Sequence, residues 1–440
     1  KTKHNEVAPA QHELAPVFDT TNVAVDHNQL TMEIMKKVAD KHDLVCLLHE
    51  KPFEGINGSG KHNNWSMITD DGVNLLDPGK TPSENIQFLV FLMAVIKAVD
   101  EYADLLRISV ASAGNDHRLG ANEAPPAVVS IFLGDELTEV LKSIENDTYF
   151  TSHGAVQMDI GATVLPHFVK DNTDRNRTSP FAFTGNKFEF RMLGSAASVA
   201  NPNIVLNTAV AEALDQFAKE LDGVAPEDME HAVHELIKRA IKKHKRVIFN
   251  GNGYTDEWIE EAEKRGLYNL KSTPDALPMW IAQKNIDLFT KHSIFTSEEL
   301  HSRYEIWLEN YSKTINIESN TMVEMVQKDL LPSVMSYIEE IASTASLKAS
   351  VVPGITCESE TALITKLSGL QDAMTKGLEK LKADTAKAKA TDDVLENAKL
   401  YQAEVLEDME ELRKSADEAE TLIPDDLLPY PTYGKLLFYI

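Results

Sequence analysis

Apolar residues recur with two different periods in the first half of the chain. Spacings of three and four predict two helices, one along Ile86, Leu89, Met93, Ile96 and Val99 and one along Leu206, Val210, Leu214, Phe217 and Leu221. The first helix has a predicted start at Thr81-Pro82-Ser83-Glu84, where a cap, a proline and a capping-box glutamate follow one another. Alternation with period two at 188–192 and a short apolar run at 45–49 predict strands.

Strand patterns nearly disappear after residue 225, and helical periods dominate. Near the end, one stripe comprises Leu363, Leu367, Leu370, Met374, Leu378 and Leu381, and another comprises Leu395, Ala398, Gln402, Val405, Met409, Leu412, Ala416 and Ala419. With a turn at 390–393 between them, these stripes predict an antiparallel helical hairpin. We therefore expect a mixed α/β region at 1–225, a helical continuation at 226–350, and the hairpin with a tail at 351–440.

The composition excludes several classes of function. Hydrophobic residues make up 43% and charged residues 25% of the 440 residues, which is enough apolar surface for a sizeable core. The net charge of −26 argues against nucleic acid or an anionic membrane as the main partner, and no apolar run is long enough to span a membrane. The two cysteines, Cys46 and Cys357, favour a reducing, cytoplasmic environment over a disulfide framework.

The strand at 188–192 has a charged face. Alternation places Lys187, Glu189 and Arg191 opposite the face that contains Phe188 and Phe190. One interpretation is a solvated, salt-bridged surface. The other is a carboxylate that binds a metal ion, flanked by cations for an anionic substrate.

The segment Asn57-Gly58-Ser59-Gly60-Lys61-His62 is rich in glycine and ends in histidine. Glycines allow the backbone to approach a ligand closely, and the histidine could present a nitrogen to a cation. The alternative is a simple turn with a structural histidine. The spacing does not match a phosphate-binding P-loop.

Other carboxylates and arginines lie in segments with proline or polar residues. Glu6 and Glu13 are either loop residues or oxygen ligands for Mg²⁺ or Mn²⁺. Because positions 6 and 13 have opposite parity, a shared ion would require a bulge or break at Pro9. Arg118 and Arg177 are either surface residues or clamps for carboxylates and phosphates.

Taken in order, these motifs resemble those of the glutamine synthetase family. They are Glu-Val-x-Pro-x-Gln-x-Glu at 6–13, Asn-Gly-Ser-Gly-x-His at 57–62, Arg-x4-Glu-Ala-Pro at 118–125, Asn-Arg-Thr at 176–178, Glu-x-Arg at 189–191 and Ala-Asn-Pro at 200–202. The resemblance covers residues 1 to about 222. The segment 184–191 and the long helical remainder look like the large type III enzymes of bacteria.

This resemblance implies a fold of the α/β (α+β) class. The expected catalytic fold is a largely antiparallel open barrel backed by helices, followed by an all-helical C-terminal region that contains the hairpin. It also implies a cytoplasmic homo-oligomer of stacked rings, a dodecamer by resemblance, with neither nucleic acid nor a membrane as partner.

The resemblance assigns roles to individual residues. Metal ligands for Mg²⁺ or Mn²⁺, with two or more ions in each active site, would be Glu6, Glu13, His62 and Glu189. Positions that match glutamate-binding residues are Asn57, Gly58, Arg118 and Arg191. Positions on the ATP side are Asn64, Ser66, Arg177 and Lys187. Glu123 matches a glutamate that helps to deprotonate ammonium, and it is grouped with Arg118 and Arg177 as catalytic.

The implied reaction joins ammonium to the γ-carboxylate of L-glutamate, with ATP as co-substrate and γ-glutamyl phosphate as intermediate. Two alternatives stay open. One is a ligase of the same fold that joins glutamate to a polyamine or another amine. The other is a non-catalytic scaffold, against which the metal-type residues argue.

Three departures from the family pattern change what is expected. An arginine normally found five residues after the one at position 177 is replaced by Ala182, for which Lys187 or Arg175 could substitute. The tyrosine-bearing regulatory loop of adenylylated enzymes has no match in 246–270, so no adenylylation is expected. The family's N-terminal sheet domain and further metal carboxylates should precede Lys1, so we expect a C-terminal portion that is inactive by itself.

Overall fold

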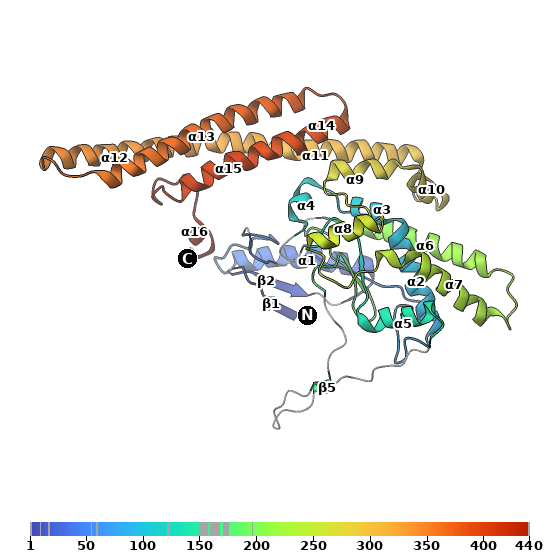
Figure 1. The fold of residues 1–440 in the computed structure, drawn as a ribbon. Coiled ribbons are helices and arrows are strands. Elements are labelled where there is room, and N and C mark those ends of the chain that lie inside the picture. Colours follow the sequence, from blue (N-terminus) through green and yellow to red (C-terminus); the bar gives the residue numbers. More distant parts are fainter. Residues whose placement is uncertain are drawn as a thin grey trace. The chain divides into compact units, whose positions relative to one another are not determined.

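The computed structural model separates the chain into two compact units, Lys1–Ser302 and Arg303–Ile440 (Figure 1). The structure describes residues 2–8, 10–15, 18–53, 55–58, 60–120, 124–148, 157–158, 168–169, 176–195 and 197–438. The division expected from sequence, with boundaries near 225 and 350, stays a prediction.

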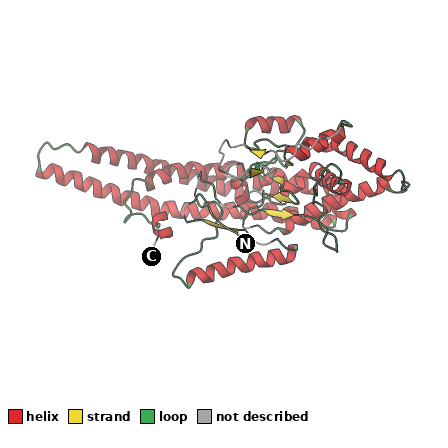
Figure 2. Ribbon diagram, turned by 90° about the horizontal axis from the view of Figure 1, so that it is seen from below, coloured by secondary structure: helices red, strands yellow, loops and turns green. Residues whose placement is uncertain are grey.

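The first unit combines short strands with many helices (Figure 2). Its strands are β1 (Thr2–Asn5), β2 (His12–Ala15), β3 (Asn63–Trp65), β4 (Ile131–Phe132), β5 (Gln157–Met158), β6 (Phe168–Val169), β7 (Phe181–Phe183) and β8 (Phe188–Phe190). Its helices are α1 (Thr21–Asp40), α2 (Ile86–Glu101), α3 (Ala103–Ile108), α4 (Ala113–Arg118), α5 (Asp135–Glu145), α6 (Ala200–Leu221), α7 (Met229–His244), α8 (Asp256–Lys264), α9 (Thr273–Ala276) and α10 (Gln283–Lys291), with 3-10 turns η1 (Lys245–Val247) and η2 (Leu277–Ile281).

The central sheet of this unit has the strand order β3-β8-β7-β4. The pairs β3–β8 and β8–β7 are antiparallel, and β7–β4 is parallel. The mixed α/β class and the helical C-terminal region are therefore confirmed. Among the described residues, no helix is both long and apolar enough to cross a membrane.

One face of this sheet is aromatic and covered by helices. Phe181 stacks on Phe188 with ring centroids 4.6 Å apart, and Phe183 meets Phe188 edge-on at 5.2 Å. Phe88 of α2 contacts Phe183 at 5.9 Å, so α2 lies over this face. Helix α6 lies beside β3, because the indole of Trp65 in β3 donates a hydrogen bond to Asn207 of α6 (2.8 Å). Aromatic packing thus leaves only the opposite face for polar side chains.

Two local predictions in the first unit are wrong. Helix α2 begins at Ile86 because the Asn85 side chain accepts a hydrogen bond from the Phe88 amide (3.1 Å), while the predicted cap at Thr81 precedes a turn. The run 45–49 is an extended loop instead of a strand, and Val45 is 78% exposed. A strand requires a hydrogen-bonded neighbour, and no strand in the described part of the chain pairs with this run.

In its described part, the second unit consists of helices joined by turns and loops, and it contains no strand. The helix α11 (Ser297–Met325) leads into it through a π-helical turn, η3 (Val326–Leu330). The other elements are α12 (Leu331–Val351), α13 (Glu358–Lys389), α14 (Val394–Leu400), the π-helical turn η4 (Tyr401–Val405), α15 (Leu406–Glu420) and α16 (Tyr433–Phe438). Helices α13 and α15 pack side by side, which confirms the antiparallel hairpin (Figure 1).

The buried stripe of the second arm differs from the predicted one. Tyr401 and Asp408 are buried, whereas Gln402 and Met409 are only partly covered. Tyr401 and Asp408 are seven residues apart, and so are Gln402 and Met409. Both pairs fit the same seven-residue repeat, so the hydrophobic pattern alone does not decide which pair is buried. Polar contacts select the buried pair, since the Tyr401 hydroxyl bonds Asn316 of α11 (3.2 Å) and Lys380 of α13 pairs with Asp408 (2.5 Å).

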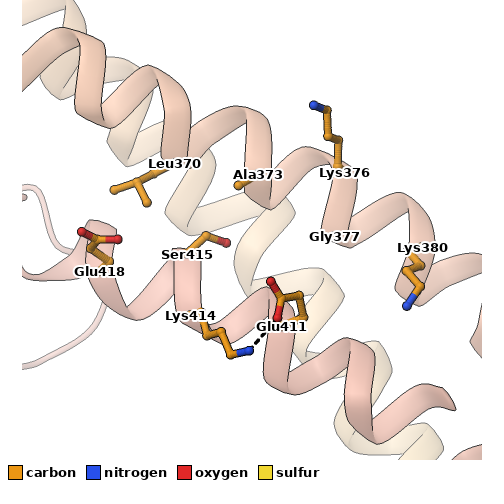
Figure 3. A pocket seen from close by; sticks show the side chains of 9 residues that line it. All are labelled: Leu370, Ala373, Lys376, Gly377, Lys380, Glu411, Lys414, Ser415 and Glu418. Carbon is orange, nitrogen blue, oxygen red and sulfur yellow. Dashed lines mark hydrogen bonds and ion pairs between the residues drawn. The ribbon is translucent and has the colours of Figure 1, made fainter.

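A groove of about 420 Å³ lies between α13 and α15 (Figure 3). Its lining residues are Leu370, Ala373, Lys376, Gly377, Lys380, Glu411, Lys414, Ser415 and Glu418. Gly377 allows the helices to approach, because a Cβ atom there would lie 3.1 Å from Leu412 Cδ1. Gly369, two turns earlier on α13, has no heavy atom within 4 Å of the same position.

These two glycines give a matched pair of substitutions. Gly369→Ala should raise the free energy of unfolding by about 1 kcal/mol, because alanine favours helix and meets no neighbour. Gly377→Ala should gain less, because its Cβ atom crowds Leu412. Hydrogen exchange of α13 and α15 amides in the 440-residue chain measures both effects, and equal gains would contradict the packing described for Gly377.

Asp408 provides a prediction about pH. Burial raises the pKa of this carboxyl, Lys380 opposes the rise, and the neighbouring Asp384 adds to it. Because this pKa is higher in the folded chain, the folded chain binds more protons than the unfolded chain above the ordinary pKa of aspartate, and this group's contribution to stability falls as pH rises through that range. Asp408→Asn removes this dependence.

We expect the free energy of unfolding of Asp408→Asn, relative to the parent chain, to be higher at pH 7 than at pH 4. Urea denaturation at the two pH values measures the difference. Asp372→Asn, at an exposed position of α13, controls for the loss of a carboxylate. A relative stability that falls between pH 4 and pH 7 would contradict the buried position of Asp408.

Candidate active site

The polar face of the central sheet contains Glu189, predicted to bind metal, and Asn64, predicted to bind nucleotide. The register places Asn64 of β3 and Ala182 of β7 directly opposite Glu189 of β8. Directly opposed residues project from the same face of a sheet. This row therefore lies on the face opposite the phenylalanines, as the alternation at 188–192 predicts.

His62 and Glu189 lie close together at this face. The His62 Nδ1 and Glu189 Oε2 atoms are 3.9 Å apart, and their side chains are 30% and 15% exposed. An imidazole nitrogen and a carboxylate oxygen at this separation, both reachable from solvent, fit as two ligands of one divalent ion. Among the described residues, however, no three His, Cys, Asp or Glu side chains converge on one ion position.

Glu6 and Glu13 lie in a separate hairpin. Strand β1 ends at Asn5 and β2 begins at His12, so the chain reverses between the two glutamates, and Pro9 lies outside the described residues. Both glutamates are partly exposed. They do not join His62 and Glu189 in a described cluster of three ligands, and their role stays a prediction.

The Gly-rich segment is held by close backbone contacts. A Cβ atom at Gly58 would lie 2.2 Å from the Glu50 carbonyl oxygen, so only glycine fits there. Gln11 of the hairpin turn donates from Nε2 to the carbonyls of His49 (2.8 Å) and Glu50 (3.2 Å). Asn57, beside Gly58, is half-buried. The hairpin and the Gly-rich segment are thus joined through residues 49–50.

Arg118 lies at the C-terminal end of α4, beneath this segment. Its Nε atom is 3.1 Å from Glu50 Oε2, and the two side chains are 4% and 16% exposed. Longer hydrogen bonds run from its Nη atoms to the carbonyls of Met192 (3.3 Å) and Arg191 (3.4 Å). Burial lowers the pKa of Arg118, and the Glu50 carboxylate opposes that shift. Because arginine stays protonated in proteins, this buried side chain is a cation that requires a partner.

Arg191 follows β8 and is buried, with an Nη1 hydrogen bond to the Asn176 carbonyl (3.0 Å). Arg177, beside Asn176, is exposed. Arg118 and Arg191 are therefore brought together through the backbone of 191–192, while Arg177 faces solvent.

The remaining predicted nucleotide-side residues surround the row of Asn64 and Glu189. Asn64 is exposed, and Lys187 is partly exposed. The Ser66 hydroxyl donates to Asn74 (2.6 Å), so its side chain is held within the protein.

Ala182 is 2% exposed and lies beside Glu189, so β7 supplies no cation at this point of the face. Lys187 immediately precedes β8, two residues before Glu189. The other substitute, Arg175, lies outside the described residues, as does the predicted catalytic Glu123.

Glu50 contacts the candidate site, although its position in the sequence does not indicate this. Its carboxylate pairs with Arg118 and accepts a hydrogen bond from the Ser195 amide (3.1 Å). The available signal was an acidic residue between an apolar run and a Gly-rich segment. That signal is weak, because such a position is also usual for a surface residue.

Comparisons with known proteins identify the family of the chain. A family model described as "Glutamine synthetase, catalytic domain" matches residues 1–129, and one described as "Glutamine synthetase C-terminal domain" matches residues 232–348. A glutamine synthetase of Butyrivibrio fibrisolvens is 58% identical over 443 residues, which cover 100% of this chain and 62% of that protein. A type-3 glutamine synthetase of Dictyostelium discoideum is 47% identical over 100% of this chain and 60% of its own length.

A third relative is a glutamine synthetase of Bacteroides fragilis (strain YCH46), which is 39% identical over 100% of this chain and 61% of its own length. This chain thus spans about three fifths of the length of these relatives. Two family models and three relatives aligned over the whole chain lead to the same conclusion: the chain belongs to the glutamine synthetase family.

Proposed function

We propose that the whole protein is an ATP-dependent glutamine synthetase of the type III class. The observation that supports this best is the pairing of His62 with Glu189 on the polar face of the sheet, near the buried cation Arg118. Family membership makes glutamate, ammonium and ATP the candidate substrates.

The proposed reaction has two steps. A γ-carboxylate oxygen of glutamate attacks the γ-phosphorus of ATP, and the bond to ADP breaks. Ammonia then attacks the acyl carbon of γ-glutamyl phosphate, the bond to the phosphate oxygen breaks, and phosphate leaves. The ammonium ion loses one proton before this attack and another as the amide forms.

Residues of this chain have distinct proposed tasks. His62 and Glu189 would hold a divalent ion, Mg²⁺ or Mn²⁺, which when bound offsets the negative charge of the phosphates. Arg118 and Arg191 would bind the carboxylates of glutamate, with Asn57 and Gly58 beside them. Glu6 and Glu13 would complete the metal ligands.

The nucleotide-side tasks fall to residues around the polar row. The residues that would contact ATP are Asn64, Ser66, Arg177 and Lys187. Lys187 would substitute for the cation that is missing at Ala182. Glu123 would accept the proton of ammonium. We also propose a cytoplasmic homo-oligomer of stacked rings, by family resemblance.

A direct assay tests the proposed function. With glutamate, ATP, Mg²⁺ and ammonium, the whole protein should form one glutamine for each ATP hydrolysed, and methylamine or putrescine should replace ammonium poorly. Preference for an amine would favour the ligase alternative, and absence of product with any of them would favour the scaffold alternative. The 440-residue chain by itself should be inactive, because the described residues provide no cluster of three metal ligands.

Glu189→Gln tests the metal assignment. An amide is a poorer ligand than a carboxylate, so half-maximal activity of the whole protein should require at least about tenfold more Mn²⁺. Electron paramagnetic resonance of Mn²⁺ without substrates should record the same loss of affinity. Glu136→Gln, at an exposed position of α5, is the control. Unchanged Mn²⁺ binding in Glu189→Gln would remove Glu189 from the ligand set.

A further inference from the structure

Glu50 lies at the point where four segments of the first unit meet. It follows the extended loop 44–49 and precedes the Gly-rich segment. The family resemblance assigns it no role. Its contacts nevertheless connect the hairpin turn at Gln11, the loop at Gly58, the helix α4 and the segment that follows β8.

The Glu50 carboxylate binds two groups on one side. Its Oε2 atom is 3.1 Å from Arg118 Nε and accepts a hydrogen bond from the Ser195 amide at 3.1 Å. The Oε1 atom would lie 3.7 Å from a Cβ atom at Gly194, so the chain after β8 packs against it. The carboxylate therefore fixes Arg118 relative to the segment that contains Gly194 and Ser195.

The main chain of Glu50 is fixed as well. Its carbonyl oxygen accepts a hydrogen bond from Gln11 Nε2 (3.2 Å) and lies against Gly58. The side chain consequently starts from a defined position, which keeps its carboxylate beside Arg118.

The Glu50 carboxylate provides the shortest polar contact of the buried Arg118 guanidinium. The two contacts of Arg118 to main-chain carbonyls are 3.3 and 3.4 Å long, and its contact to Asn115 Oδ1 is 3.4 Å, whereas the ion pair with Glu50 is 3.1 Å. Charge-assisted contacts are the stronger kind. The Nε atom forms no aligned hydrogen bond to a described residue, so Glu50 acts on the guanidinium as a nearby opposite charge at 3.1 Å.

The Nη2 atom of the guanidinium faces the Gly-rich segment. A Cβ atom at Gly60 would lie 3.5 Å from Arg118 Nη2 and 3.6 Å from His62 Nε2. Arg118 and the proposed metal ligand His62 thus flank the same glycine. A second cation, Lys61, is anchored by its hydrogen bond to the Ala197 carbonyl (2.6 Å).

We propose that Glu50 is a positioning residue for the amino-acid substrate. Its carboxylate lies 3.1 Å from Arg118 Nε and keeps the guanidinium in place. The Nη2 atom then lies beside Gly60 and His62, where a substrate carboxylate would bind. This inference rests on the proposed function. Glu50 acts through Arg118 and does not itself contact the substrate.

Variants of Glu50 in the whole protein test this role. Glu50→Ala leaves Arg118 without its carboxylate and should raise the KM for glutamate by about 10- to 100-fold, the usual effect of losing a contact with a charged group. The KM for ATP should change less than about threefold on the same reasoning. Glu50→Gln retains an acceptor oxygen for Ser195 and Arg118, so it should recover part of the loss.

A double-mutant comparison separates positioning from general stability. If Glu50 acts through Arg118, then Glu50→Ala should have almost no further effect on the glutamate KM of an Arg118→Ala variant. Glu145→Ala is the matched control, because Glu145 forms an ion pair with Lys245 (2.7 Å) and its side chain is 14% exposed, close to the 16% of Glu50. It should leave both KM values unchanged.

The outcomes distinguish this inference from the proposed function. If the unmutated whole protein makes no glutamine, the proposed function fails. If it is active, the positioning role is overturned by an unchanged glutamate KM in Glu50→Ala, by equal rises in both KM values, or by additive effects with Arg118→Ala. Circular dichroism reports folding. If Glu50→Ala is unfolded, the KM comparison in Glu50→Gln decides, and unfolding of both variants would make Glu50 a structural residue and overturn the proposal.

Discussion

The central position of β8 in its sheet determines how the first unit is arranged. Because β8 pairs on both sides, with β3 and with β7, its alternating side chains must point to two different environments. Phe188 and Phe190 enter the aromatic layer, where burial of rings provides much of the stabilisation. Glu189 is then forced onto the other face. The chemistry of the site therefore follows from the packing of the core.

The buried arginines add a second constraint. Placing Arg118 and Arg191 under the backbone after β8 removes two cations from water, which is costly unless partners are present. For Arg118 the structure supplies a carboxylate at Nε and carbonyl oxygens at the Nη atoms. In the proposed function, such an arrangement would prepare a cation for an anionic substrate without leaving it exposed to competing ions.

The sequence predicted those features that depend on short-range periodicity. Helix α2, helix α6, the alternation at β8 and the α13–α15 hairpin were recognisable because each extends over several repeats of its period. The run 45–49 misled because apolar composition does not reveal whether a neighbouring strand exists. The buried pair in the last hairpin arm depended on Asn316 and Lys380, which are far away in the sequence. Glu50 was missed for the same reason, since its partner is Arg118.

The contact between Gly58 and the Glu50 carbonyl has a consequence for the comparison of related proteins. The 2.2 Å separation from a Cβ position makes glycine a steric requirement of the loop itself, with no reference to a ligand. A descendant of this fold that had lost catalysis would thus still retain Gly58, whereas the described packing places no comparable steric requirement on His62, which is 30% exposed. If His62 binds metal as proposed, the histidine is therefore the better marker for separating active members of the family from inactive ones, although the glycine is the more constrained position.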